Sequence, residues 1–299
     1  MSNSVLAIYY TQTGQLAEIV DNFTEPLIAA GISVEKVSIK PKNDYDFPWT
    51  SDRFFDKMPE SVLGIPSELA PFVLKENSYA LIILAYQPWF LSPSLPVTSL
   101  LATPAFQAVL KNTPVVTLIG ARNMWLSSQD KIKKILSSSG ARLVGNIALT
   151  DKHSNLVSAF TILYWMLTGK KDRYLNKFPK PGIADQDIKN SSLFGKTVQQ
   201  HLQNGNWNGM QEALVRQKAV VVEDDLMFIE ARARKLFSIW ANIIIKKKNR
   251  LPWVKLFKYY LLVALFIVAP LVLTVNRILF KPFALKRIRQ KKQYYSGLN

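Results

Sequence analysis

The stretch "VLAIYYTQTGQLAEIV", residues 5–20, changes its pattern at its centre. Residues 5–10 are apolar and rich in β-formers, which predicts a short buried strand. Residues 15–30 carry apolar side chains at helical spacing and end before Gly31, which predicts a helix. The hydroxyl-rich loop between them, TQTG at 11–14, is of a kind that commonly holds an anion at a helix N-terminus.

Four further segments predict strands of the same sheet. Residues 32–40 alternate apolar and polar side chains, as an edge strand does, whereas residues 79–86 are apolar on both faces, as a central parallel strand is. Residues 113–120 and 141–150 complete the set. Helical or long connections separate the strands, so we expect an α/β fold with a doubly wound, five-stranded parallel sheet.

The rest of the chain is predicted to be helical. Residues 155–169 are apolar nearly all round, and helical patterns continue over 192–204 and 208–245. Residues 41–78 are irregular but rich in aromatic side chains, which is typical of a lid or a packed insertion. We predict three parts: a cofactor-binding α/β domain over 1–152, a helical extension over 153–245, and a basic, hydrophobic, membrane-associating tail over 246–299.

The charge of the chain is concentrated in that tail. The net charge is +17, but residues 1–245 carry 25 Lys and Arg against 21 Asp and Glu, whereas residues 246–299 carry thirteen basic residues and no acidic one. The body is therefore nearly balanced, and we expect no nucleic acid partner. Cysteine is absent and the two histidines are far apart, so neither thiolate chemistry nor a metal site is expected. The N-terminal residues lack a basic n-region, so we expect the body to be cytosolic.

The loop at 11–14 fits a single terminal phosphate better than it fits other phosphate motifs. A Walker A loop needs a lysine after its last glycine, and Gly14 is followed by Gln15. A dinucleotide fingerprint needs three spaced glycines, and this loop has one. Threonine hydroxyls and the N–H groups of a helix N-terminus suit a phosphate monoester. Taken alone, the loop is explained equally well by Thr13 acting as an ordinary helix N-cap.

Two further loops decide between these alternatives. "AYQPWFLSPSLP" (85–96) follows the central strand and places two aromatic residues beyond its carboxyl end. "IGARNMW" (119–125) follows the next strand, and its glycine allows a close approach of backbone to ligand. In a doubly wound sheet, the carboxyl ends of such strands border one crevice. A phosphate loop, an aromatic loop and a third loop of backbone groups together predict FMN as the cofactor.

In these loops the sequence resembles the flavodoxin-like superfamily over residues 1–150, about half the chain. The resemblance implies a strand order of 2-1-3-4-5 and bound FMN, with the phosphate in the first loop, the ring on the second and the pyrimidine edge on the third. The Gln15-Leu16 pair departs from electron-carrier flavodoxins, which more often have a small polar residue there. The predicted FMN-binding residues are Thr11, Gln12, Thr13, Gly14, Gln15, Leu16, Pro88, Trp89, Phe90, Gly120, Ala121, Arg122 and Asn123.

A longer set of segments resembles a narrower group, the flavodoxin-like aromatases (condensing-enzyme family) of dialkylresorcinol and flexirubin-type pigment biosynthesis in bacteria. These segments are "YYTQTGQL", "FPWTSDRFFDKMPESVLGIP", "ILAYQPWFLSPSLP", "NTPVVTLIGARNMW" and "HSNLVSAFTILYWMLTGKK". The resemblance implies a ketosynthase partner that joins two acyl chains into a cyclohexanedione. It also implies a lipid-like dialkyl substrate, which loses two hydrogens on becoming a resorcinol. A flavin is an obvious acceptor for them.

The tail contains an uncharged segment of eighteen residues, "YYLLVALFIVAPLVLTVN" (259–276). As a helix it is about 27 Å long, just short of a hydrocarbon core of roughly 30 Å. Basic clusters on both sides leave its orientation undefined and predict anionic lipids as partners. Three arrangements stay open: a tilted span, a segment bent at Pro270 that dips into the cytoplasmic leaflet, and a buried core helix. We expect the chain at the cytoplasmic face of the inner membrane, anchored by 259–276.

Two residues are predicted to take part in catalysis. His153 follows the fifth strand at its carboxyl end and is the best-placed base for an acidic C–H. A surface histidine in a turn explains it equally well. Arg122, in the third loop, is predicted to stabilise negative charge on a flavin or on an enolate oxygen.

Together these observations predict a membrane-associated, FMN-dependent oxidoreductase. Its expected reaction is the oxidative aromatisation of a dialkylcyclohexanedione to a dialkylresorcinol. Two alternatives stay open at this point. One is a membrane NAD(P)H:quinone-type flavin oxidoreductase, and the other is a non-enzymatic, flavodoxin-shaped scaffold that holds a ketosynthase at the membrane.

Overall fold

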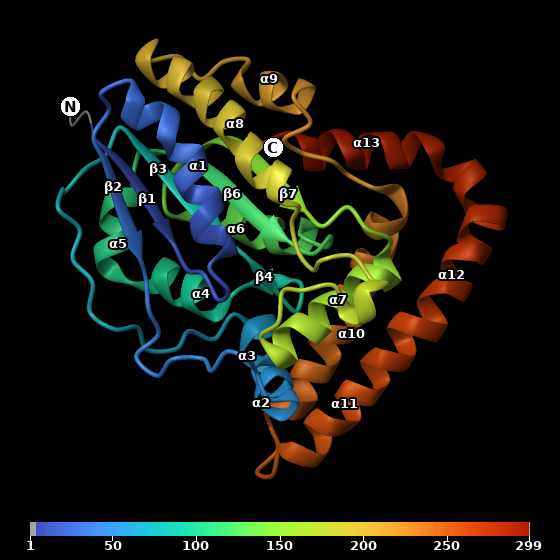
Figure 1. The fold of residues 1–299 in the computed structure, drawn as a ribbon. Coiled ribbons are helices and arrows are strands. Elements are labelled where there is room, and N and C mark those ends of the chain that lie inside the picture. Colours follow the sequence, from blue (N-terminus) through green and yellow to red (C-terminus); the bar gives the residue numbers. More distant parts are fainter. Residues whose placement is uncertain (1–3, 299) are drawn as a thin grey trace.

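The computed structural model describes residues 4–298, so residues 1–3 and 299, at the ends of the predicted first and third parts, lie outside the described residues. Its centre is a sheet of five parallel strands in the order β2-β1-β3-β6-β7 (Figure 1). Counted along the chain within this sheet, the order is 2-1-3-4-5, which confirms the predicted doubly wound, flavodoxin-like fold. The strands are β1 (Val5–Tyr9), β2 (Val34–Ser38), β3 (Leu81–Tyr86), β6 (Pro114–Ala121) and β7 (Arg142–Thr150).

Alternation along the strands gives the sheet two apolar faces. In β1, Leu6 and Ile8 belong to one buried cluster, and Val5 and Ala7 belong to the other. The first face is covered by α4, α5 and α6, and the second by α1 and α8. These helices are α1 (Gln15–Ala29), α4 (Leu95–Ala102), α5 (Pro104–Leu110), α6 (Leu126–Ser138) and α8 (Asp185–Gln203).

Helices α1 and α8 lie side by side on one face of the sheet (Figure 1). They approach closely at Gly195, where a Cβ would overlap the carbonyl oxygen of Phe23. Helix α9 (Met210–Arg216) follows and places Met210 and Leu214 in the same core. Sequence beyond residue 152 therefore covers part of the sheet. The predicted domain boundaries at 152 and 245 stay predictions.

The helical pattern expected over 208–245 is interrupted. Helix α9 ends at Arg216, and α10 (Asp224–Ile244) begins only after an extended stretch. The backbone explains the break, because the carbonyl of Ala219 accepts a hydrogen bond of 2.8 Å from the N–H of Ala148 in the outer strand β7. Val220 and Val222 are buried there, so these β-branched side chains belong to an extended segment at the edge of the sheet and not to a helix.

The stretch 41–78 forms a packed insertion. It contains α2 (Ser51–Asp56) and α3 (Met58–Leu63), neither of which the sequence pattern predicts. Thr50 caps α2 by accepting a hydrogen bond from the N–H of Arg53. Trp49 and Phe55 are both buried. Burial of two large aromatic side chains holds this insertion against the body.

The C-terminal part is a nearly continuous helical run, Leu251–Ser296, which by length and composition is long enough and apolar enough to cross a membrane. It comprises α11 (Leu251–Val263), α12 (Ala269–Val275) and α13 (Leu285–Ser296), with π-helical turns at 264–268 and 276–280. Each π-helical turn precedes a proline, Pro270 or Pro282, which lacks the N–H that a regular helix requires. After the second proline the chain turns, and α13 runs back over the body (Figure 1).

Candidate functional site

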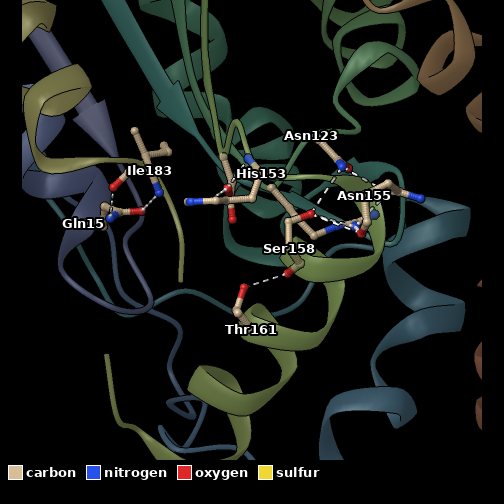
Figure 2. A network of polar contacts seen from close by, with 9 residues as sticks. Gln15, Asn123, His153, Asn155, Ser158, Thr161 and Ile183 are labelled. Carbon is tan, nitrogen blue, oxygen red and sulfur yellow. Dashed lines mark hydrogen bonds and ion pairs between the residues drawn. The ribbon is translucent and has the colours of Figure 1, made fainter. Parts of the chain in front are cut away.

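The three loops singled out in the sequence meet at one edge of the sheet. They follow β1, β3 and β6, which are neighbours and parallel, so their carboxyl ends lie together. Helix α7 (Asn155–Thr168) follows β7 and adds its N-terminus to the same edge. Figure 2 shows the polar contacts that connect these segments.

The first loop leaves its anion-binding groups free of protein partners. Gly14 has φ +84°, a left-handed conformation that favours glycine, and the space beside it is open. The hydroxyl of Thr11 is buried without a hydrogen-bond partner. The hydroxyl of Thr13 makes no hydrogen bond within residues 4–298, so the interpretation of Thr13 as an N-cap is wrong. Two hydroxyls and the first N–H groups of α1 are thus available to a phosphate monoester.

Two glutamines of this loop use their side chains within the protein. The amide of Gln12 accepts from the hydroxyl of Tyr10 (2.8 Å) and donates to the carbonyl of Tyr45 (3.2 Å). The amide of Gln15 is buried and bonds both the N–H and the carbonyl of Ile183, each at 3.0 Å (Figure 2). Both residues can therefore offer a ligand their backbone groups only.

The second loop is a tight hairpin with two strained residues at its tip. It joins β4 (Pro88–Trp89) to β5 (Ser92–Pro93), and its tip residues Phe90 and Leu91 have φ +48° and +60°. Left-handed backbone at a bulky residue costs about 1–2 kcal/mol and persists only where surrounding contacts enforce it. Lys131 of α6 supplies one such contact by donating to the hydroxyl of Ser92 at 2.8 Å.

The hairpin sends its two aromatic side chains into different surroundings. Trp89 is buried edge-on against Tyr10, Tyr45 and Trp49, with ring centroids 5.2–5.9 Å apart. Phe90 instead packs against Phe54, with a centroid distance of 4.8 Å, and against aromatic residues of α2 and α11. The predicted pair of stacking residues is therefore split between two clusters, and their flavin-stacking role stays a prediction.

The third loop is tied to the start of α7. Arg122 donates from one guanidinium nitrogen to the carbonyl and side-chain oxygens of Asn155, both at 2.9 Å, and Asn123 donates to the same side chain at 3.0 Å (Figure 2). Asn123 keeps one buried amide oxygen without a partner. Burial lowers the pKa of Arg122 to about 10, opposed by the carboxylates of Asp151 and Glu230, so Arg122 is a cation at neutral pH.

Two of the predicted loop residues face the core rather than the crevice. Gly120 lies in β6, and a Cβ built there would meet the side chains of Leu16 at 3.1 Å and Ile183 at 3.6 Å. Leu16 is itself buried, on the face of α1 that packs in the core. The carbonyl of Ala121 is occupied by the N–H of Asp151. Gly120 and Leu16 therefore contribute to packing behind the crevice, and Ala121 contributes a backbone hydrogen bond to its wall.

His153 is held by a buried aspartate. The carboxylate of Asp151 lies 2.6 Å from Nδ1 of His153 and accepts its backbone N–H at 2.9 Å, while the other carboxylate oxygen is buried without a partner. In Figure 2 His153 is drawn between the Gln15–Ile183 pair and the Asn155 cluster. The side chain of His153 is 43% exposed, and its Nε2 has no hydrogen-bond partner among residues 4–298. Its role as a base stays a prediction.

An apolar cavity of about 400 Å³ adjoins these loops. It is lined by Pro88, Phe90 and Arg122 from the second and third loops, by α2, by Leu163 and Met166 of α7, by α10, and by α11 and α12. Its volume lies within the range of small-molecule sites. No sequence pattern in the tail or in α10 signals this cavity, because its walls come from segments that are distant along the chain.

Sequence patterns also miss a buried carboxyl group behind the third loop. Glu230 of α10 is 1% exposed and accepts a hydrogen bond of 2.6 Å from the N–H of Ser127, in the first turn of α6. Burial raises the pKa of Glu230 to about 7. In the sequence it is one glutamate among the polar positions of a long helix, so no local pattern distinguishes it.

Comparison with known proteins adds little beyond the fold. No family model matches the chain, and no curated protein matches it. Among solved structures, a flavoprotein from Lactobacillus acidophilus in complex with FMN is 15% identical, with 49% of this chain and 93% of that chain covered and a TM-score of 0.40. An archaeal flavodoxin is 9% identical, with 67% of this chain and 99% of the flavodoxin covered and a TM-score of 0.37. A flavone reductase is 11% identical, with 67% of this chain and 63% of the reductase covered and a TM-score of 0.36.

Likenesses at this level carry no conclusion about activity. The class follows from the strand order of the chain itself: this is a protein of flavodoxin-like fold whose three crevice loops lie where that fold binds its ligand.

Proposed function

We propose that this chain is a membrane-associated, FMN-dependent oxidoreductase that converts a dialkylcyclohexanedione into a dialkylresorcinol. One observation carries the proposal. Pro88, Phe90 and Arg122 belong to the loops that would surround a flavin, and the same three residues line the apolar cavity. A redox cofactor at the sheet edge and alkyl chains in the cavity would therefore be in contact, as oxidation of a lipid-like ring requires.

The free groups of the first loop support FMN as the cofactor. The hydroxyls of Thr11 and Thr13 and the first N–H groups of α1 would hold its phosphate. The buried amide oxygen of Asn123, which has no partner, is an acceptor available at the third loop. When bound, FMN supplies a two-electron acceptor, the chemistry that the removal of two hydrogens needs.

Arg122 at the border of the cavity and His153 in the turn after β7 support the substrate class. Arg122 places a fixed positive charge at the border between the polar loops and the apolar walls, where an enolate oxygen would be stabilised. His153, oriented by Asp151, would take the proton from the acidic ring C–H at Nε2. Loss of one proton to His153 and of one hydride, for which bound FMN would supply the two-electron chemistry, would balance the conversion of the dione to the resorcinol.

The partners in this proposal are a ketosynthase, which supplies the cyclohexanedione, and a membrane of anionic lipids. The proposed location is the cytoplasmic face of the inner membrane. The thirteen basic residues after residue 245 support the lipid partner.

The test is a single-turnover reaction with FMN-loaded protein in detergent without oxygen. A long-chain dialkylcyclohexane-1,3-dione is added, flavin absorbance is followed, and product is analysed by mass spectrometry. The proposal predicts bleaching and a product lighter by two hydrogens, with much slower reaction of the ring that lacks alkyl chains. Bleaching by NAD(P)H and recovery with a quinone, without reaction of the dione, would establish the quinone oxidoreductase instead. A flavin-free protein that co-purifies with a ketosynthase would establish the scaffold.

A further inference from the structure

Both ends of the apolar helical run are attached to the same body. At its start, Arg250 forms an ion pair of 2.8 Å with Glu60 of α3, and Lys258 lies 3.8 Å from Asp52 of α2. Val254 and Phe257 are fully buried among residues of α2 and α10. Exposed ion pairs stabilise a fold much less than burial of such apolar side chains does. Apolar packing therefore holds the start of α11 on the body, and the ion pairs fix its position along α2 and α3.

The end of the apolar segment returns to α10. Arg277, the first charged residue after it, donates from Nε to Asp225 at 2.8 Å. Lys281 and Lys292 both lie 3.0 Å from Asp224. Asp224 and Asp225 are the first two residues of α10, whose other end packs against α11. The apolar segment thus lies along α10 between two points of attachment.

Helix α13 is docked on the body. The hydroxyls of Tyr294 and Tyr295 donate to Asp130 of α6 at 3.2 and 3.3 Å. The carbonyl of Ser296 accepts a hydrogen bond of 2.8 Å from Gln211 of α9. Figure 1 shows α13 returning from the turn after α12 towards α8 and α9. The residues after the apolar segment therefore contact elements of the sheet domain.

The apolar run presents an outward face that the protein leaves uncovered. Only 11% of its most apolar window is buried, so it is not the core helix of a soluble protein. Seven apolar or aromatic residues three or four positions apart, each 48–68% exposed, form what we call the outer stripe. Its members are Leu256, Tyr259, Val263, Ile267, Leu271, Val275 and Ile278. An apolar face of this length marks an interaction surface.

Charges around the outer stripe favour a lipid surface over a protein. In the described residues from 246 onward there are thirteen basic side chains and no acidic one. Lys246, Lys248, Lys286, Arg287 and Arg289 have no ion-pair partner among the described residues. Free basic residues beside an apolar stripe are typical of a helix that lies in the interface of an anionic membrane.

We propose that residues 251–280 lie in the plane of one leaflet, with the outer stripe in the lipid and both ends on the same side of the membrane. This inference rests on the membrane association in the proposed function and selects among its arrangements. A span would carry α13 across the bilayer, away from Asp130 and Gln211, and would expose Val254 and Phe257. The inward face of α11 and α12 lines the apolar cavity, so this placement also brings the cavity to the leaflet that holds the substrate.

The absence of cysteine makes the topology directly measurable. Asn249→Cys and Gln293→Cys place one thiol on each side of the apolar segment, and Gln186→Cys on α8 marks the body; all three positions are exposed. Each variant is produced in a bacterial host, and its membranes are treated with a membrane-impermeant maleimide, as intact spheroplasts and as inverted vesicles. We expect all three thiols to react in inverted vesicles and to be protected in spheroplasts.

Two other results overturn the inference in different ways. Reaction of Gln293→Cys only in spheroplasts, with the other two reacting only in inverted vesicles, would establish a span and leave membrane association intact. Recovery of all three variants in the soluble fraction would overturn membrane association, and with it that part of the proposed function.

A second experiment tests the outer stripe itself. Ile267→Glu with Leu271→Glu should lower binding to vesicles of phosphatidylglycerol and phosphatidylcholine at least about tenfold, because two apolar side chains leave the lipid. Val73→Glu with Leu193→Glu is the matched control, since both positions are exposed and apolar but lie outside the tail. Unchanged vesicle binding of the stripe variant, together with loss of a co-purified ketosynthase, would assign the stripe to a protein partner and overturn the inference.

Discussion

The polar and apolar halves of the candidate site are built in opposite ways. The polar half lies in short loops at the ends of neighbouring strands, and two of its groups, the hydroxyls of Thr11 and Thr13, have no hydrogen-bond partner among the described residues. The apolar half has walls from α2, α7, α10, α11 and α12, segments that meet only in the folded chain. The two halves join at Pro88, Phe90 and Arg122.

This difference teaches how the two functions of such a site are encoded. A phosphate needs a few donors at fixed spacing, which one loop and one helix N-terminus supply. Alkyl chains need volume and apolar surface, which only packing between distant elements supplies. In the proposed function the phosphate site is therefore local in the sequence, and the site for the alkyl chains is not. Variants in each half should separate the two functions.

The largest effect is expected from the phosphate loop. Thr11→Ala combined with Thr13→Ala removes two hydroxyls that would bond a phosphate, at about 2 kcal/mol each for charge-assisted bonds. The Kd for FMN should rise about a thousandfold, as measured by fluorescence titration of apoprotein. Thr168→Ala is the control, because its hydroxyl bonds the carbonyl of Tyr164 within α7. Equal FMN affinity of the double variant and the control would refute the phosphate assignment.

The proposed base belongs to the polar half and should affect turnover alone. His153→Gln should lower kcat for the dione about a hundredfold, as expected for loss of a general base, with KM and FMN content unchanged. His201→Gln is the matched control, since it is the other histidine of the chain and lies at the end of α8. A full rate with His153→Gln would exclude the imidazole as the base.

Glu230 connects the two halves. It belongs to α10, which lines the cavity, and its carboxylate accepts a hydrogen bond from the N–H of Ser127 in the first turn of α6. Burial raises its pKa from 4.5 to about 7, so the folded state favours the protonated form. The associated stability is fully present below about pH 4.5 and is lost as the pH rises through 7. The free energy of unfolding of Glu230→Gln, measured relative to that of the native protein, should therefore increase by about 3 kcal/mol when the pH is raised from 5 to 8.

Denaturant unfolding at both pH values measures this difference. Gln keeps a side-chain oxygen that can accept from Ser127, so the variant is expected to fold. A stability difference that does not change with pH would show that Glu230 is not protonated in the folded state.

Filling the cavity should separate substrate binding from cofactor binding. Leu163→Trp adds a large side chain to the cavity wall, and the KM for a long-chain dione should rise about thirtyfold, or about 2 kcal/mol. FMN affinity should not change. Leu167→Trp on the same helix is the control, because Leu167 is exposed and outside the lining. Equal KM values for the two variants would place the alkyl chains elsewhere.

The smallest effect is expected at the tip of the phosphate loop. Gly14→Ala places a Cβ at φ +84° in open space, so only backbone strain of about 1 kcal/mol is introduced. Thermal unfolding of the apoprotein should show this loss. A much larger loss would mean that the glycine is needed for packing rather than for conformation.

The sequence allows the sheet and the position of the loops to be predicted, because parallel strands with long connections bring their carboxyl ends together. It does not allow side-chain directions to be predicted. Gln15 bonds Ile183, which is 168 positions away. Trp89 and Phe90 are adjacent and alike in pattern, yet left-handed backbone at Phe90 turns it towards the tail. The cavity depends on how α10 and the tail dock, which periodicity alone does not encode.

The absorption spectrum of the full chain purified in detergent tests the central claim most directly. The polar half should retain FMN, so we predict flavin bands at about one FMN per chain, or their appearance on reconstitution with FMN. A spectrum without flavin bands, together with no uptake of FMN, would contradict the account.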